Sequence, residues 1–431
     1  MQTRFSAAAL ADPDMAASEA VIRKCVHCGF CTATCPTYVL LGDELDSPRG
    51  RIYLIKEMLE EGREPTAAVV QHIDRCLSCL SCMTTCPSGV NYMHLVDHAR
   101  AYVEERYRRP VRERLLRWLL ATVLPHPGRF RLALAAARLA RPAEPMLRRS
   151  PALRPLAAML KLAPGRTPAA ATTAASPVPA PSRGRVVLLQ GCVEPVLRPE
   201  IREATLRLLA RAGYEVAFAR DEGCCGALVH HMGKKDEALA AARRNVDAWT
   251  AEIEGPGVDA ILVTASGCGV TVKDYGFVLR EDPAYAEKAA RVSALAKDIL
   301  EFVAAVGLPG AGRASPLTVA YHAACALQHG QRVTDAPRRL LAEAGFEVRT
   351  PAEAHLCCGS AGVYNILQPD LADAIGERKA AHLDKLQADV IATGNVGCAT
   401  QIGVRASVPV VHTVELLDWA SGGPRPPSLS R

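Results

Sequence analysis

The sequence predicts a multidomain α+β protein, in which a helical N-terminal domain precedes two copies of one α/β domain. Three observations predict this architecture. Two short cysteine-rich runs lie within residues 25–86, and a helical pattern separates them. A segment rich in Ala, Pro, Ser and Thr at 167–182 then interrupts the chain. Beyond it, cysteines recur at distances of 130–133 residues, which indicates an internal duplication.

The two cysteine-rich runs share one spacing. They read "CVHCGFCTATCP" and "CLSCLSCMTTCP", and both fit C-x2-C-x2-C-x3-C-P. In bacterial iron–sulfur proteins three such thiolates bind one cluster, and the fourth cysteine binds the other cluster. Zinc sites instead use pairs of cysteines. We therefore expect two [4Fe–4S] clusters, with ligand sets Cys25, Cys28, Cys31 and Cys86, and Cys76, Cys79, Cys82 and Cys35.

The segment between the runs, "SPRGRIYLIKEMLEEG", has the apolar spacing of a helix. Ile52, Ile55, Met58 and Leu59 recur on one helical face, and Gly62 ends the pattern. A helix here favours a helical, ferredoxin-like two-cluster domain over a compact β-rich ferredoxin. We place this domain at residues 1–98.

Residues 99–166 form a strongly basic segment. The segment contains fifteen Arg and one Lys but only four Glu, whereas the whole chain has a net charge of only +6. Three interpretations stay open: contact with an anionic membrane surface, contact with a partner subunit, or a helical lobe with a solvated Arg face. Nucleic acid is not expected, because no base-reading motif accompanies the charge. Two amphipathic helices are expected, on Leu115, Leu116, Leu119 and Leu120 and on Phe130, Leu132, Leu134 and Leu139, with "PHPG" between them.

The duplication covers the remaining chain. After an extended linker at 167–182, we place the first repeat at 183–312 and the second at 313–431. Strands alternating with helices predict a largely parallel sheet in each repeat, with ligands at the carboxyl ends of the strands. The cysteines follow these strands, so their thiols should converge on one rim, with the two copies facing each other. The eight candidate ligands are Cys192, Cys224, Cys225 and Cys268, and Cys325, Cys357, Cys358 and Cys398.

The chemistry of the repeats stays open at the level of sequence. Four soft ligands fit a further iron–sulfur cluster or zinc. A redox-active dithiol and a purely structural set of buried cysteines are the alternatives. Gly226 and Gly359 permit the turn that each Cys-Cys-Gly segment needs. For His322, near Cys325, a hydrogen-bonded core histidine is favoured over a ligand or a proton relay.

The cellular compartment is predicted from the targeting and membrane-spanning segments that the sequence lacks. The N-terminus lacks the pattern of a signal peptide, and no stretch has the ~18 apolar residues of a membrane-spanning helix. We therefore expect a cytoplasmic protein whose thiols are kept reduced.

Longer motifs reveal a family resemblance. Duplicated Cys-Cys-Gly domains behind two ferredoxin-like runs resemble the Cys-Cys-Gly domain family of heterodisulfide reductase-like proteins. "DSPRGRIYLIK", "LPHPGRFRLAL", "SGCGVTVKDYG", "LCCGSAGVYNILQP" and "TGNVGCATQIG" are similar to the glycolate oxidase (glycolate dehydrogenase) iron–sulfur subunits of that family. The chain departs from the heterodisulfide reductase pattern, since each repeat ends in a single cysteine, Cys268 or Cys398, instead of C-x-x-C. A five-cysteine non-cubane cluster is therefore not expected.

The resemblance implies an electron-transfer subunit of an oxidoreductase complex. FAD-containing flavoprotein subunits would oxidise glycolate to glyoxylate, and the two clusters would pass the electrons to an acceptor, a quinone at the inner face of the cell membrane. Peripheral membrane association is part of this expectation. No substrate oxidation is expected from this chain alone, because no G-x-G-x-x-G follows a strand and no P-loop is present. The alternatives are the electron-transfer subunit of a glycerol-3-phosphate or lactate dehydrogenase, and a heterodisulfide reductase-like thiol–disulfide enzyme.

Overall fold

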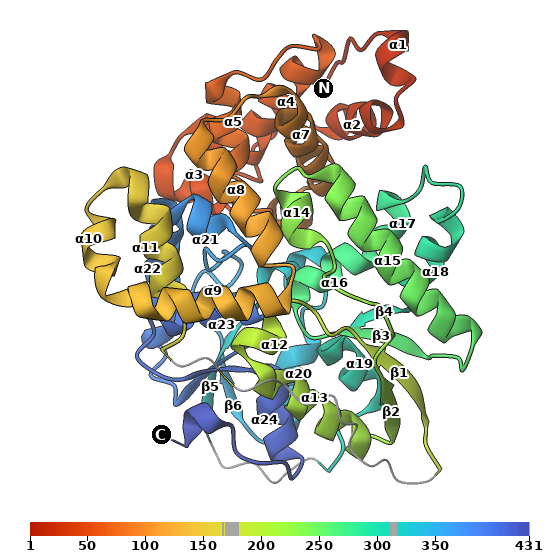
Figure 1. Cartoon of the computed structure of the whole chain (residues 1–431), viewed down its shortest axis with the longest axis vertical. Coiled ribbons are helices and arrows are strands. Elements are labelled where there is room, and N and C mark those ends of the chain that lie inside the picture. The colour runs from red at the N-terminus through yellow and green to blue at the C-terminus, as the bar shows by residue number, and fades with distance from the viewer. Residues whose placement is uncertain (166–167, 169–180, 311–316, 431) are drawn as a thin grey trace.

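The computed structural model describes residues 1–165, 168, 181–310 and 317–430. Figure 1 shows the N-terminal helices at one end and two small sheets at the other, with a group of helices lying between them. Most of the expected linker at 167–182 lies outside the described residues. The expected boundary between the repeats, at 312, also lies outside them.

The N-terminal part is helical, as predicted, and no strand precedes β1 among the described residues. The helix expected between the cysteine runs is α4, whose residues Ile52, Ile55, Met58 and Leu59 are buried. It begins after Ser47, whose side chain accepts a hydrogen bond from the free N–H of the first turn. The elements are α1 (Ala7–Leu10), α2 (Pro13–Lys24), α3 (Pro36–Leu41), η1 (Glu44–Asp46), α4 (Pro48–Glu60), α5 (Ala67–Asp74), α6 (Ser81–Thr85) and α7 (Tyr92–Arg106).

The basic segment folds into a helical lobe, which we call the basic lobe. Its apolar faces differ from those expected. Phe130 and Leu134 are buried, but Leu115, Leu132 and Leu139 are exposed. Periodicity locates an apolar stripe on a helix, whereas the tertiary packing decides which part of it is covered. The lobe comprises α8 (Val111–Val123), α9 (Pro127–Ala140), η2 (Arg141–Ala143), α10 (Glu144–Arg148), η3 (Pro151–Leu153) and α11 (Arg154–Leu162), with the expected break at "PHPG".

The first repeat contains a four-stranded parallel sheet in the order β2-β1-β3-β4. Its strands alternate with helices, as predicted. In order along the chain, its elements are β1 (Gly184–Leu188), α12 (Glu194–Leu197), α13 (Pro199–Arg211), β2 (Tyr214–Ala217), α14 (Ala227–His231), α15 (Lys235–Glu254), β3 (Ala260–Val263), α16 (Ser266–Lys273), α17 (Tyr275–Val278), α18 (Ala286–Leu295), β4 (Ala296–Asp298) and α19 (Ile299–Val306).

The second repeat contains the equivalent sheet, in the order β6-β5-β7-β8. The two closing helices, α19 and α24, both begin with a capping box, formed by Asp298 with Glu301 and by His412 with Glu415. The elements are β5 (Thr318–His322), η4 (Ala326–Gly330), α20 (Ala336–Glu343), β6 (Glu347–Arg349), α21 (Tyr364–Leu367), α22 (Pro369–Asp384), β7 (Val390–Thr393), α23 (Val396–Gly403), β8 (Val410–His412), α24 (Thr413–Ala420) and η5 (Pro427–Leu429).

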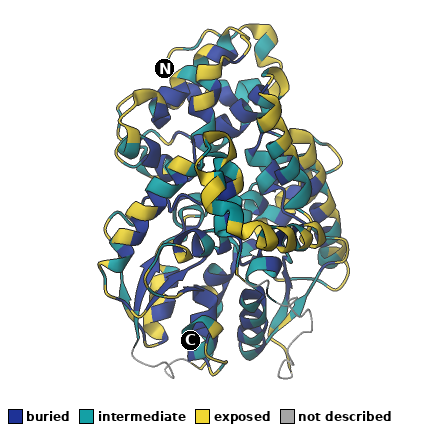
Figure 2. Cartoon of the chain, turned by 60° about the vertical axis from the view of Figure 1, so that its left-hand side comes forward, coloured by how far each residue is buried: buried dark blue, intermediate teal, exposed yellow. Residues whose placement is uncertain are grey.

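The two repeats share one hydrophobic core. Val186 of the first sheet and Val319 of the second belong to the same buried cluster. Buried Asp418 in α24 adds an ionic link, because it pairs with Arg207 and Arg211 of α13. Figure 2 shows buried residues in both sheets and the helices beside them, as well as in the N-terminal helices. The repeats therefore hold each other in a fixed orientation, with the carboxyl ends of both sheets on the same side.

Within the ranges that the structure describes, none of the helices has the length and apolar character needed to cross a membrane.

Candidate functional site

The first cysteine run closes on a member of the second. Cys25, Cys28 and Cys31 follow the end of α2 in a loop, and Cys86 comes after α6. All four line one small cavity, and Cys82 also reaches it. The loop contains left-handed residues, among them His27 at φ 56° and Gly29 at φ 85°, which turn successive thiols toward a common centre.

The second run closes on a member of the first. Cys35, just before α3, lines a cavity with Cys76, Cys79 and Cys82. The structure thus brings together the two sets of four that the spacing predicts, with the fourth cysteines exchanged. Four thiols per set have the donor chemistry of a [4Fe–4S] cluster, so the residues fit this group.

A buried ion pair lies beneath the second set. Arg51 is only 1% exposed and donates to the carboxylate of Asp46 (3.2 Å) and to the Sγ of Cys35 (3.8 Å). Asp46 is fully buried and also pairs with His72 and Arg75. The sequence reasoning missed this pair. The sequence indicates this pair only through the position of Arg51, which lies four residues before Ile55 on the apolar stripe of α4.

The second set touches the second repeat. Cys79 packs in one apolar cluster with Cys357, and Cys325 lies against the same cluster. Burial raises the pKa of the Cys79 thiol well above its usual value, and the nearby Cys325 raises it further. The N-terminal domain and the second repeat therefore share a dry, thiol-rich contact.

All eight cysteines of the repeats line one cavity of about 320 Å³, which we call the thiol cavity. This is the predicted convergence at the carboxyl ends of the strands, with the two copies facing each other. The basic lobe covers the cavity with apolar side chains from three helices, including Leu120 of α8, Phe130 of α9 and Met159 of α11. The sequence could not predict that these helices cover the cavity, because an apolar helical pattern does not identify the surface against which the helix packs.

Hydrogen bonds between thiols shift the pKa values in both repeats. In the first repeat, hydrogen bonds from the thiols of Cys192 and Cys225 lower the pKa of the Cys224 thiol, whereas the pKa values of Cys192 and Cys225 are raised. In the second, Cys325 donates to Cys357 across 3.6 Å, and this bond and burial raise the pKa of the Cys325 thiol. A metal that binds either set must therefore displace protons.

The glycine of each Cys-Cys-Gly segment has the predicted backbone role. Gly226 (φ 85°) and Gly359 (φ 87°) are both left-handed. The N–H of Gly359 donates to the Sγ of Cys357 at 3.4 Å, and a Cβ at Gly359 would lie 2.7 Å from the carbonyl oxygen of Ala372. The turn and the thiol placement therefore depend on one another.

His322 contradicts the interpretation of a hydrogen-bonded core histidine. It is 1% exposed, and neither ring nitrogen has a hydrogen-bond partner among the described residues. One of its nitrogens and the Sγ atoms of Cys358 and Cys398 are three possible ligand atoms that lie within 4.8 Å of one another.

We expect Arg51→Met to lower the reduction potential of the cluster held by the second set, since it removes a cation and an N–H···S contact. It should also destabilise the fold by about 1.5–3 kcal/mol, the worth of a hydrogen bond to a charged group. Redox titration followed by EPR measures the first effect, and urea unfolding the second. Arg63→Met, at an exposed ion pair, is the matched control. An unchanged potential in Arg51→Met would contradict the role given to this arginine.

Gly359→Ala should destabilise the protein by at least ~1–2 kcal/mol, because alanine is strained in the left-handed region and its Cβ meets backbone. The control is Gly128→Ala in α9, where an added Cβ meets no atom within 4 Å and alanine favours the helix. Urea denaturation of both variants makes the comparison. Equal stability of the two variants would show that the turn tolerates a side chain.

Comparisons with known proteins agree with this architecture. Residues 21–90 match the 4Fe-4S dicluster domain, and residues 186–273 and 319–403 both match the Cysteine-rich domain. The crystal structure of a hypothetical protein from Helicobacter pylori has a TM-score of 0.55 and 11% identity. It covers 97% of this chain and 74% of that chain, and it bears on the fold alone.

Two relatives match nearly end to end. The glycolate oxidase iron-sulfur subunit of Escherichia coli (strain K12) is 41% identical over 421 residues, which cover 97% of this chain and 99% of that protein. The "Probable glycolate oxidase iron-sulfur subunit" of Bacillus subtilis (strain 168) is 32% identical and covers 94% of this chain and 95% of that protein. The predicted fold class, cofactor class and family resemblance are confirmed. The chain belongs to the family of glycolate oxidase iron–sulfur subunits.

Proposed function

We propose that this chain is the electron-transfer subunit of a glycolate dehydrogenase complex. It receives electrons from a FAD-containing flavoprotein that oxidises glycolate to glyoxylate, and it delivers them to a quinone. The observation that supports the proposal is the apolar cluster shared by Cys79 and Cys357, against which Cys325 packs, because it joins the proposed cluster site of the N-terminal domain to the thiol cavity.

The ligands in this proposal are the two exchanged sets. Cys25, Cys28, Cys31 and Cys86 hold the first [4Fe–4S] cluster, and Cys76, Cys79, Cys82 and Cys35 hold the second. When bound, such a cluster accepts and donates single electrons. The chain's own residues exclude water from the second set, since Cys76, Cys79 and Cys82 are all buried. Arg51 supplies a fixed positive charge beside Cys35.

The domain boundaries belong to the same proposal. Residues 1–98 carry the clusters, and residues 99–166 are the basic segment, whose helices α8 to α11 form the basic lobe. The repeats at 183–312 and 313–431 follow the linker at 167–182. The acceptor site is placed at the thiol cavity, whose cover of leucine, phenylalanine and methionine side chains suits a lipophilic ring.

We expect the purified chain to show no glycolate-dependent dye reduction by itself. Adding the flavoprotein subunits should restore it, because the two-electron chemistry then has a flavin. Parallel assays with glycerol 3-phosphate, lactate and a disulfide separate the alternative functions.

Cys79→Ser should block electron delivery while the flavin is still reduced by glycolate, and Cys28→Ser, at an exposed member of the other set, provides the comparison. Turnover of glycolate by the chain alone would overturn the proposal.

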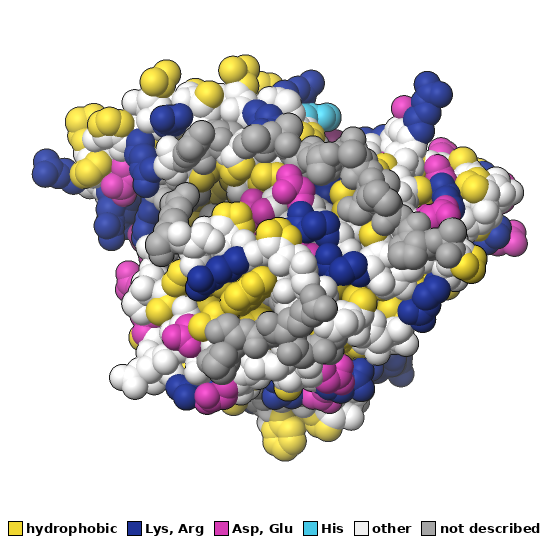
Figure 3. Space-filling view, turned by 90° about the horizontal axis from the view of Figure 1, so that it is seen from below, with side chains coloured by type: hydrophobic (Ala, Val, Ile, Leu, Met, Phe, Trp, Pro, Cys, Tyr) yellow, Lys and Arg dark blue, Asp and Glu magenta, His cyan; other side chains and the backbone are white. Residues whose placement is uncertain are grey.

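The basic lobe is proposed as the membrane-facing surface. Val111, Leu115 and Trp118 recur at helical spacing on α8 and are 75%, 62% and 57% exposed. On the left of Figure 3, the side where Figure 1 places α10 and α11, hydrophobic side chains lie among those of Lys and Arg. Apolar side chains inside a basic surface are the combination that binds anionic lipid headgroups and their acyl boundary.

Trp118→Glu should weaken binding to vesicles containing phosphatidylglycerol by about tenfold, the effect of ~1.4 kcal/mol of lost apolar burial. Binding should also fall with salt. Val404→Glu replaces an exposed apolar residue of the second repeat and is the control. Flotation of protein with vesicles measures the effect. Unaltered vesicle binding by Trp118→Glu would contradict the membrane role, and weakened binding to the flavoprotein instead would assign this face to the partner subunit.

A further inference from the structure

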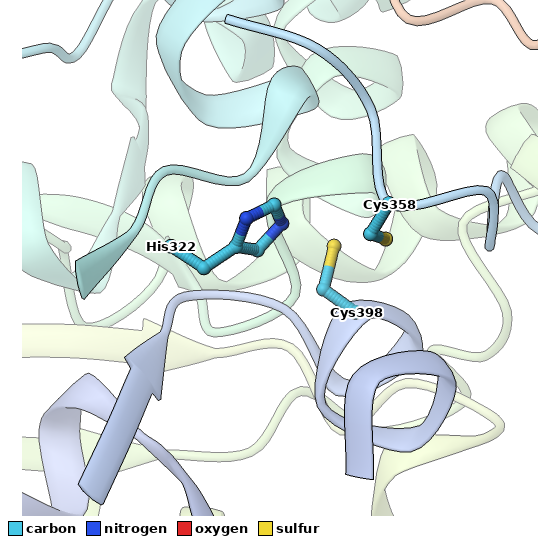
Figure 4. Close-up of side chains that lie close together, drawn as sticks. All are labelled: His322, Cys358 and Cys398. Carbon is cyan, nitrogen blue, oxygen red and sulfur yellow. The ribbon is translucent and has the colours of Figure 1, made fainter. Parts of the chain in front are cut away.

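His322 lies at the end of β5, among the cysteines of the second repeat (Figure 4). Its side chain is fully enclosed, and both ring nitrogens lack a hydrogen-bond partner among the described residues. An imidazole needs a partner for at least one nitrogen, and a buried polar atom without one costs about 1–3 kcal/mol. A buried nitrogen of this kind is accounted for when a bound ion or water, which the protein chain itself does not provide, is its partner.

The imidazole points toward two thiols. Figure 4 shows His322 directed from the end of β5 toward Cys358, in the Cys-Cys-Gly loop, and Cys398, at the start of α23. One donor atom from each of the three lies within 4.8 Å of the others. Two ligand atoms that are each ~2.0–2.3 Å from one metal ion lie at most about 4.6 Å apart, and these three atoms are gathered to about that range.

Two further thiols of the second repeat bring the number of candidate donors to five. Cys325 and Cys357, whose Sγ atoms are 3.6 Å apart, adjoin the same group. The second repeat therefore offers four thiols and one imidazole, whereas a structural zinc ion takes four ligands. A cluster with several irons can use all five donors. The nearby ammonium of Lys379 donates to the carbonyl oxygen of Glu353 at 2.6 Å, and it is not a hydrogen-bond partner of the His322 imidazole.

The first repeat has no equivalent nitrogen. Leu189 stands three residues before Cys192, as His322 stands three residues before Cys325. Leu189 is buried in an apolar cluster beside the first sheet. The duplication has therefore kept the thiols in both copies, and at this position only the second copy has an imidazole. His231 of the first repeat also lines the thiol cavity, but its Nδ1 lies 3.4 Å from the carboxylate of Asp97.

We propose that His322 is a nitrogen ligand to iron in a cluster held by Cys325, Cys357, Cys358 and Cys398. At the position equivalent to His322 the first repeat has Leu189, which offers no ligand atom. The inference rests on metal binding by the second repeat and is independent of which substrate the complex oxidises. A neutral imidazole adds no negative charge, so the centre keeps a higher reduction potential than it would have with a fifth thiolate. A higher potential favours electron transfer to the second repeat from the neighbouring N-terminal set.

The test uses the full chain, purified without oxygen and labelled with ¹⁵N at histidine only. Pulsed EPR of the reduced protein should show a ¹⁵N imidazole coupling to a cluster. His322→Leu, which copies the residue of the first repeat, should abolish the coupling. His355→Leu replaces a partly exposed histidine two residues before Cys357 and should leave the coupling unchanged.

Metal analysis completes the test. Wild-type protein should contain more than the about eight irons of two [4Fe–4S] clusters. Absence of the ¹⁵N coupling in wild-type protein would overturn the inference, as would its persistence in His322→Leu. Zinc in place of the additional iron would overturn it as well. None of these results depends on glycolate turnover, which the dye assay tests separately.

Discussion

The common core of the two repeats is the constraint on which the remaining structure depends. A parallel sheet brings side chains together only at the carboxyl ends of its own strands, so one repeat alone can gather four thiols. Packing Val186 of one sheet into the same core as Val319 of the other turns both sets toward a single cavity. Asp418, with Arg207 and Arg211, fixes the relative orientation of the repeats. The eight-thiol site is therefore a property of the pair.

In the N-terminal domain, charged side chains are buried close to the cysteines and are paired with one another. Arg51 pairs with Asp46, and the Asp46 carboxylate also pairs with His72 and Arg75. The resulting network lies directly under Cys35. Because Cys79 of the same set packs against Cys357, the domain is joined to the second repeat through its sulfur-rich side. The basic lobe then closes the thiol cavity from outside.

Much of this arrangement could be predicted from spacing. The exchange of Cys35 and Cys86 follows from the C-x2-C-x2-C-x3-C-P pattern, and the common rim follows from cysteines placed after strands. The outward position of Leu132 and Leu139 could not be predicted, since periodicity defines a stripe but not its neighbour. The isolation of His322 could not be predicted either. Hydrogen-bond partners of a buried side chain come from distant segments, and the sequence favoured a partner for this imidazole that none of the described residues provides.

The exchanged cysteines have a consequence for how the protein is made. The cavity of the second run needs Cys35 from the beginning of the chain, and that of the first run is complete only when Cys86 arrives. Both sets are therefore incomplete in a nascent chain that ends before the second run. Because Cys82 is synthesised before Cys86, the set that begins with Cys25 is the last to gain its fourth ligand. The two sites are thus interlocked in assembly, and iron delivered early in synthesis finds only part of either set.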